Sequence, residues 1–165
     1  MQPLQRKLRG VSTSAIIALV LFAAPLSAQN PKTQLSLSGG AITFPAPTAT
    51  DYINGYVYST GGVTYTLDAT NGTQSHTTTV SIRATSVNLG GSKPLGDLEW
   101  RRSDLAAWNT IGSADAQVEQ KVMVRGSLND PWSNTIIFRI KLSWTADPPA
   151  TYSANYQITL SQTVP

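Results

Sequence analysis

The chain has 165 residues and no cysteine, which excludes a disulfide framework, thiol chemistry and thiolate metal sites. Its formal charge of +3 comes from Arg6, Lys7 and Arg9, because the remaining nine basic residues balance nine acidic ones. The rest of the chain is therefore formally neutral and lacks the basic surface expected of a nucleic-acid-binding protein.

The N-terminal residues have the three-part layout of a secretory signal peptide. A basic segment precedes an apolar run over 15–25, and small residues follow up to Ala28. The apolar run is shorter than the roughly 20 residues of a transmembrane helix. We therefore expect 1–28 to be a signal peptide, with an uncleaved membrane anchor as the alternative. A short linker over 29–33 and one domain over 34–165 follow, and the protein is expected in the periplasm, on the outer surface or outside the cell.

Alternating apolar and polar residues predict short strands along most of the domain, since successive side chains of a strand point to opposite faces. Gly, Pro and Asn separate these strands, with a tight-turn signal at Asn71-Gly72. The alternating segments before residue 130 lie at 35–37, 42–44, 56–58, 63–67, 80–84 and 118–124. The segment 97–112 is ambiguous, and we expect a strand with Leu98 and Trp100, a loop with at most one helical turn, and a second strand.

The stretch 136–160 gives the strongest strand signal. Apolar residues alternate from Ile136 to Trp144 and again from Tyr152 to Leu160, with Pro148-Pro149 between the two runs. Prolines lack the backbone donor that a central ladder needs, so they predict a loop or corner. Trp144 is in phase with the apolar face and is expected to be buried.

Eight or nine short strands with this spacing predict an all-β fold. We expect a single immunoglobulin-like, Greek-key antiparallel β-sandwich. Tyr152 enters the last strand in phase with the buried face, and its hydroxyl is a candidate to return to the upstream backbone as in a tyrosine corner. The alternative is a plain core aromatic.

The pattern WTADPPATYSA, followed by an alternating terminal strand, resembles the C-terminal end of small exported bacterial β-sandwich proteins of the pilin-like, spore-coat-protein-U-like group. The resemblance covers about the last 30 residues, the signal peptide and the general layout. It implies a secreted sandwich that assembles with other chains, often by strand exchange. The chain differs from those pilins in having no cysteine.

No residue pattern indicates an enzyme, a cofactor or a metal site. His76 is the only histidine and is expected to be a solvated loop residue. Asp97 and Glu99 would share one strand face with Arg101, as a surface charge cluster in which Arg101 pairs with Glu99. Oxygen ligands for calcium lie near expected turns, but they lack EF-hand spacing and are ordinary turn residues: Asp51, Asn54, Asp68 and Asn71.

The aromatic residues are the most informative set. Tyrosines crowd 52–65, and Trp108 and Trp132 lie in or beside expected loops. Tyr and Trp are enriched at protein interfaces, so exposed members could bind a protein or stack on sugar rings. The candidate interaction aromatics are Tyr52, Tyr56, Tyr58, Trp108 and Trp132. Packing in the core is the alternative for each of them.

Three functions fit these features. The first is a non-enzymatic structural or interaction protein, a subunit of a fibre, coat or envelope complex formed with itself or with other proteins. An open sheet edge is a template for strand addition, and the segment 33–40 could be the donated strand or an ordinary first strand. The second is a carbohydrate-binding module, and the third is a membrane-tethered extrinsic subunit that keeps residues 1–28.

Overall fold

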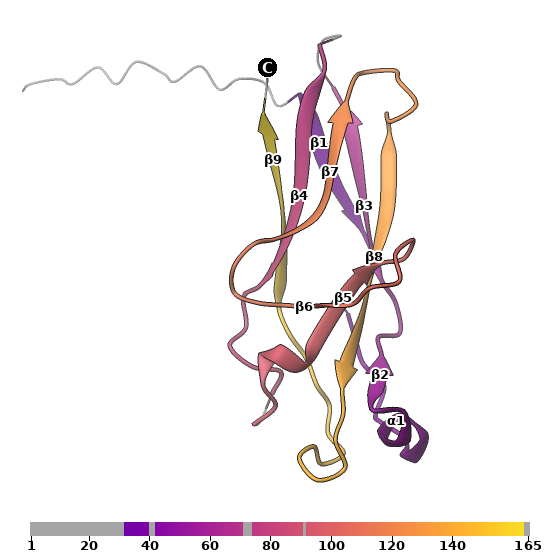
Figure 1. The fold of residues 1–165 in the computed structure, drawn as a ribbon, viewed down its shortest axis with the longest axis vertical. Coiled ribbons are helices and arrows are strands. Elements are labelled where there is room, and N and C mark those ends of the chain that lie inside the picture. The colour runs from indigo at the N-terminus through magenta and orange to yellow at the C-terminus, as the bar shows by residue number, and fades with distance from the viewer. Residues whose placement is uncertain (1–31, 40–41, 71–73, 91, 164–165) are drawn as a thin grey trace, which may run out of the picture.

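The computed structural model describes residues 32–39, 42–70, 74–90 and 92–163. The expected signal segment 1–28 and the expected turn at Asn71-Gly72 lie outside the described residues. Within them, two antiparallel sheets face each other as a sandwich, which confirms the all-β prediction (Figure 1). The described part holds nine strands, within the expected eight or nine. The immunoglobulin-like Greek-key connectivity stays a prediction.

The larger sheet has six strands. Its order is β1-β3-β8-β5-β6, and β2 pairs with β8 beyond the end of β3. The strands are β1 (Thr33–Ser38), β2 (Tyr56–Tyr58), β3 (Val63–Ala69), β5 (Leu98–Arg102), β6 (Asn109–Thr110) and β8 (Trp132–Lys141). The edges of this sheet are therefore β1 on one side and the two-residue β6 on the other.

The smaller sheet has three strands in the order β7-β4-β9. They are β4 (His76–Ala84), β7 (Ala116–Met123) and β9 (Tyr156–Thr163). Because only β4 is central, both β7 and β9 are edge strands. The edge strands β1 and β9 come together on the same side of the sandwich, because the Gln162 side chain on β9 bonds the backbone of Thr33 on β1.

The core follows the alternation of the sequence. Every second residue of β3 and β4 is buried, and the same holds for β8 from Ile136 to Ile140. The largest fully buried apolar side chains are Tyr65, Leu67, Ile82, Leu89, Ile111, Met123, Ile136, Phe138 and Ile140. Burial of such side chains, each contributing about 1.5–3 kcal/mol, is the main stabilising force of a chain without cysteine.

The sequence pattern did not predict two short helical elements, the α-helix α1 (Ala49–Asn54) and a 3₁₀ turn over Leu95–Asp97. Thr48 accepts a hydrogen bond from the Asp51 backbone, while the Asp51 carboxylate accepts one from the Thr48 backbone. This is a capping box, with Asp in the place where Glu or Gln is usual. Gly55 ends the helix with φ of 79°, a left-handed conformation that favours glycine.

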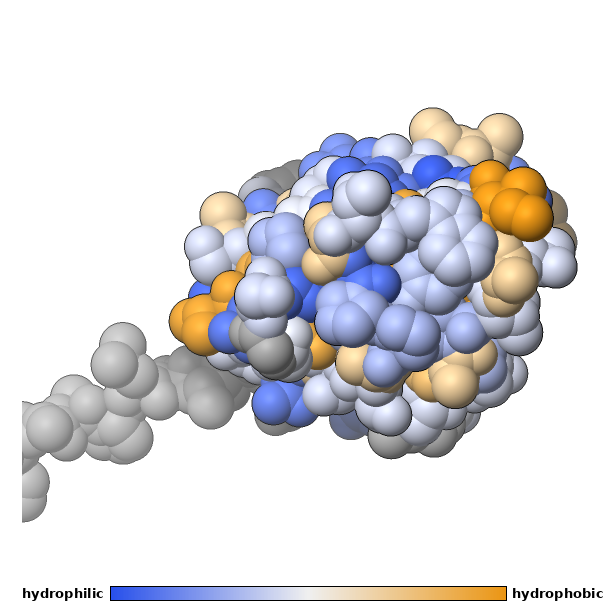
Figure 2. Space-filling model, turned by 90° about the horizontal axis from the view of Figure 1, so that it is seen from below, coloured by the Kyte–Doolittle hydropathy of each residue, from blue (hydrophilic) through white to orange (hydrophobic). Residues whose placement is uncertain are grey.

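One end of the sandwich carries α1 and the long 142–155 connection, and β9 ends at the other (Figure 1). Viewed from the α1 end, apolar residues form separate small patches on a largely polar surface (Figure 2). The segment 103–115, which includes β6, crosses from β5 in the larger sheet to β7 in the smaller one (Figure 1). Among the described residues, no helix is long and apolar enough to cross a membrane.

Candidate functional site

Three of the predicted interaction aromatics meet on the outer face of the six-stranded sheet. Val57 points into the core, so Tyr56 and Tyr58 point outward from β2. Trp108, just before β6, lies beside Tyr58 with ring centroids 5.8 Å apart, and the Tyr56 and Tyr58 rings are 5.1 Å apart. Together with two arginines described next, these residues form the outer aromatic patch.

Two guanidinium groups from the sheet hold the Trp108 ring. Arg139 on β8 lies 4.3 Å from its centroid, and Arg101 on β5 lies 5.0 Å from it. Arg139 also contacts the Tyr56 ring at 4.9 Å. The outer aromatic patch therefore consists of Tyr56, Tyr58, Arg101, Trp108 and Arg139. Such cation–π contacts contribute about 0.5–1 kcal/mol each at exposed sites.

Both guanidinium groups of this patch already donate hydrogen bonds within the protein. Arg139 donates from Nε to Glu99 Oε2 at 2.7 Å. Arg101 donates to the backbone carbonyls of Arg102, Ser103 and Leu105 and does not pair with Glu99, so the expected Glu99–Arg101 pair is wrong. The strand register causes the difference, because Glu99 lies directly opposite Arg139 in the β5–β8 ladder.

Asp97 does not share the strand face of Glu99 as expected. It lies in a 3₁₀ turn, η1 (Leu95–Asp97), directly before β5. Its carboxylate is 2.8 Å from Lys93 Nζ and 3.9 Å from Lys141 Nζ. The carboxylates of this region are therefore each paired with a lysine or an arginine, as in a structural charge cluster.

Tyr52 and Trp144 lie away from the outer aromatic patch: Tyr52 packs in the core, the alternative given for it, whereas Trp144 differs from expectation. Tyr52 is buried on α1 and donates its hydroxyl to the Asp147 carbonyl at 2.9 Å. Trp144 is 62% exposed and stacks on Tyr52 with centroids 4.6 Å apart. The prediction of a buried Trp144 is wrong because β8 ends at Lys141, so Trp144 lies in the following turn.

Trp132 begins β8 and is half-buried. Its indole N–H donates to Glu119 Oε2 at 3.0 Å, and Lys121 Nζ lies 3.1 Å from its ring centroid. Both its polar atom and its ring are thus used within the molecule. Trp132 is therefore an internal contact and no part of an exposed binding surface.

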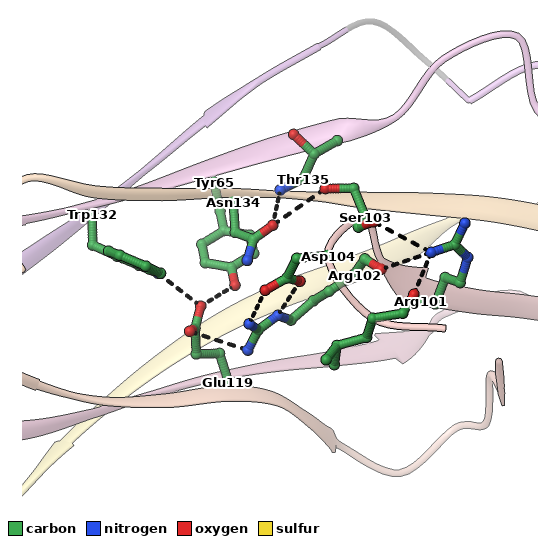
Figure 3. Close-up of polar contacts among 10 residues, drawn as sticks. Tyr65, Arg101, Arg102, Ser103, Asp104, Glu119, Trp132, Asn134 and Thr135 are labelled. Carbon is green, nitrogen blue, oxygen red and sulfur yellow. Dashed lines mark hydrogen bonds and ion pairs between the residues drawn. The ribbon is translucent and has the colours of Figure 1, made fainter. Parts of the chain in front are cut away.

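Glu119 is the centre of a polar network between the two sheets (Figure 3). Besides the Trp132 bond, its carboxylate accepts a short hydrogen bond from Tyr65 and forms an ion pair of 3.1 Å with Arg102. Burial and the hydrogen bond to Glu119 raise the pKa of Tyr65 above its ordinary value. The bidentate bond from Arg102 lowers the pKa of Asp104 to about 2. The groups of this network bond one another within the protein, so the network serves as a structural connection between the two sheets.

A β-bulge points Glu119 inward. In the β4–β7 ladder, Val80 pairs with Glu119 and Ser81 with Gln117, so Val118 has no partner. A bulge of this kind reverses the direction of the following side chains. Val118 and Glu119 are consequently both buried, although neighbouring residues of a regular strand face opposite ways.

His76 is 1% exposed at the start of β4, so the expectation of a solvated loop residue is wrong. The strand begins earlier than the apolar pattern indicated, and His76 falls on the inward parity of Val80 and Ile82. Its Nε2 makes a short hydrogen bond with Thr33 Oγ1 on β1. Gln162 on β9 bonds both the N–H and the carbonyl of Thr33. These contacts tie β1 to the opposite sheet.

Tyr152 anchors the long connection before β9. Its hydroxyl donates to the Pro148 carbonyl at 2.7 Å, the predicted return to the upstream backbone. Lys93, only 4% exposed, lies 5.9 Å from the Tyr152 ring and 2.6 Å from Asp147 Oδ2. A pocket of about 180 Å³ lies beside these residues. The strand itself begins at Tyr156, four residues later than expected.

The side of the sandwich formed by β1 and β9 is open, and we call it the open side. Leu37 faces inward on β1, directly opposite buried Tyr65, yet it is 50% exposed because the three-stranded sheet does not cover it. A groove of about 540 Å³ lies there. Its apolar lining is formed mainly by Leu37, Ile42, Tyr156 and Ile158.

The candidate calcium ligands do not assemble into a site. The Asp51 carboxylate is used by the capping box of α1, and this bonding lowers its pKa. Asn71 lies outside the described residues. Among those described, no group of three or more His, Cys, Asp or Glu side chains could hold a metal ion.

No protein-family model matches the chain, and neither the curated proteins nor the solved structures contain a significant match to it. The geometry of the described residues therefore provides two candidate binding surfaces. One is the outer aromatic patch, and the other is the open side.

Proposed function

We propose that this protein is a non-enzymatic, exported subunit of a homo-oligomer that joins a second copy of itself along the free edge of β9. The single observation that carries the proposal is the open side. There, the inward-facing Leu37 of β1 stays 50% exposed because the three-stranded sheet stops at β9. One further strand beside β9 would cover it and satisfy the unpaired backbone of that edge.

The two sides of the sandwich differ in how their edges are protected. On the far side, β6 has two residues, and β7 has a bulge and the inward charges Glu119 and Lys121. Short strands, bulges and inward charges are the devices that prevent edge-to-edge pairing. On the open side, β9 reads YQITLSQT and β1 reads TQLSLS, with no charge, proline or glycine in either. Only the open side is therefore built to accept a strand.

A second copy is the occupant that fits this edge best. The β9 strand is uncharged, so it can pair antiparallel with itself about a two-fold axis without needing an oppositely charged partner. Such isologous contacts are the commonest interfaces of soluble oligomers. The pairing would continue the three-stranded sheet into six strands and bring apolar side chains of the second copy over the groove.

Charge reversal in the middle of β9 tests the proposal. Thr159 lies on the outer face of β9, opposite Ser81, so a substitution there leaves the core intact. Near a two-fold axis each residue lies beside its own copy, and like charges placed there repel. We expect light scattering of the purified full chain to give a dimer or larger, Thr159→Lys and Thr159→Glu each to give monomers, and an equimolar mixture of the two to re-associate.

Val122→Lys is the matched control, because Val122 is exposed on the outer face of the opposite edge strand, β7. It should leave the mass of the oligomer unchanged. A monomeric wild-type protein, or a Val122→Lys effect equal to that of Thr159→Lys, would overturn the proposal. Intact mass of the same sample tests export, since a chain starting at Gln29 has lost its signal peptide and a full-length chain supports a tethered subunit.

A further inference from the structure

The outer aromatic patch lies on the outer face of the six-stranded sheet, whereas the open side faces the interior between β1 and β9. We propose that this patch is a binding platform for a neutral, β-linked oligosaccharide, with sugar rings stacking on Trp108 and Tyr58. The proposal goes beyond self-association and does not depend on it.

The platform is held in place before any ligand binds. Arg101 and Arg139 lie side by side on the outer faces of β5 and β8, so both contact Trp108 from the sheet. The indole is thereby fixed, although its loop carries no other regular structure. A ring that is already ordered loses little conformational entropy when a ligand binds. Binding is then favourable even when the contact area is small.

The three rings contact one another at interplanar angles of 68° and 43°, and Tyr58 is the most accessible of them. Tyr58 is 46% exposed, and its ring lies between those of Tyr56 and Trp108, at 5.1 and 5.8 Å. β-Linked glucose and N-acetylglucosamine units have flat C–H faces, and such faces stack on aromatic rings that present their electron-rich side.

The charge state of the patch favours a neutral ligand. Glu99 neutralises Arg139 at 2.7 Å, and three backbone carbonyls accept from Arg101. The hydrogen bonds that each guanidinium already makes reduce its capacity to bind the carboxylates or sulfates of an acidic polymer. Displacing Glu99 would leave a half-buried carboxylate without its main partner, which is unfavourable.

Hydrogen-bonding groups for sugar hydroxyls are also present. Within the described part of the chain, the hydroxyls of Tyr56 and Tyr58 make no hydrogen bond to protein. The exposed side chain of Thr110 on β6 lies on the same outer face, because Thr110 is opposite Glu99 in the ladder with β5. Flat apolar rings bordered by free hydroxyl groups match the two kinds of surface that a sugar presents, its C–H face and its hydroxyl rim.

The test is a titration of the purified full chain with cellohexaose, laminarihexaose and chitohexaose, followed by intrinsic tryptophan fluorescence and calorimetry. We expect saturable binding of at least one of them. Trp108→Ala and Tyr58→Ala should each weaken that binding about ten-fold or more, as for a central aromatic contact. Circular dichroism and the unfolding midpoint would establish that both variants are folded.

Trp144→Ala is the matched control, because this indole is even more exposed but lies on the α1 end of the molecule. It should leave sugar affinity unchanged, as should the monomeric Thr159→Lys variant. The absence of binding to all three oligosaccharides at millimolar concentration would overturn the proposal. So would binding that survives Trp108→Ala, or loss of self-association in Trp108→Ala, which would make the patch a protein interface.

Discussion

Glu119 on β7 and Arg102 on β5 form an ion pair of 3.1 Å through the interior, although their strands belong to different sheets. The pair exists because the bulge at Val118 points Glu119 inward. Tyr65 and Trp132 donate to the same carboxylate from β3 and β8. One acidic side chain on the far edge of the smaller sheet thus contacts three strands of the larger one.

Removal of this carboxylate should destabilise the fold strongly. We expect Glu119→Leu to lower the free energy of unfolding by about 3 kcal/mol, because Arg102 loses a buried partner and two donors lose their acceptor. Urea unfolding followed by tryptophan fluorescence measures the change. Gln120→Leu, one residue along on the exposed face, should change it by less than about 0.5 kcal/mol. Equal effects of the two variants would contradict the assigned role of Glu119.

The raised pKa of Tyr65 should make the folded protein less stable at alkaline pH. Burial and its bond to Glu119 raise its pKa, so the folded protein keeps the phenol proton where the unfolded chain loses it, above the ordinary value of 10.0. The unfolded state is then favoured as pH rises, by up to about 1.4 kcal/mol per pH unit for one group. We expect Tyr65→Phe to show a shallower loss of stability above pH 10 than wild type. Parallel profiles would show that Tyr65 ionises equally in both states.

Asp130 should make the stability of the fold depend on pH in the acid range. Its carboxylate accepts from the backbone N–H groups of Ala69 at 2.7 Å and Gly126 at 2.6 Å, and these bonds lower its pKa. Its contribution to stability is present above the unfolded value near 3.8 and is lost as pH falls through the lower folded value. We expect Asp130→Asn to lower the urea midpoint at neutral pH and to flatten its decline below pH 4. A decline as steep as in wild type would assign the acid sensitivity to other carboxylates.

Local alternation was sufficient to predict most strands, because the period of two is a direct consequence of strand geometry. It placed Ile136 to Ile140 of β8 on the core face, as found. It was wrong for Trp144, because the pattern continued past Lys141 while the strand did not, and for 42–44, which alternates but forms no strand. It missed α1, since six residues are too few for a helical period and only the Thr48–Asp51 capping box marks the helix.

The candidate sites were harder to predict from the sequence than the strands, because they depend on tertiary structure. Tyr58 and Trp108 are 50 residues apart and meet because β2 and β5 both pair with β8, which no local pattern reveals. The inward direction of Glu119 depends on a bulge that the sequence of β7 does not signal. His76, in contrast, lies on the parity of Val80 and Ile82, so extending that strand backward through three β-branched threonines would have placed it inward.

The attachment of β1 gives a prediction about local stability. This strand pairs only with β3, and Gln162 adds a tie from the opposite sheet by accepting from the N–H groups of Lys32 and Thr33 and donating to the Thr33 carbonyl. We expect Gln162→Ala to lower the free energy of local opening at the Lys32 and Thr33 amides by about 1–2 kcal/mol, since both lose their acceptor. Hydrogen exchange followed by NMR measures this directly, with the amides of β3 as an internal reference. Ser161→Ala, on the exposed face of the same strand, should leave exchange at β1 unchanged, and an equal effect would mean that the Gln162 side chain has no specific role in holding β1.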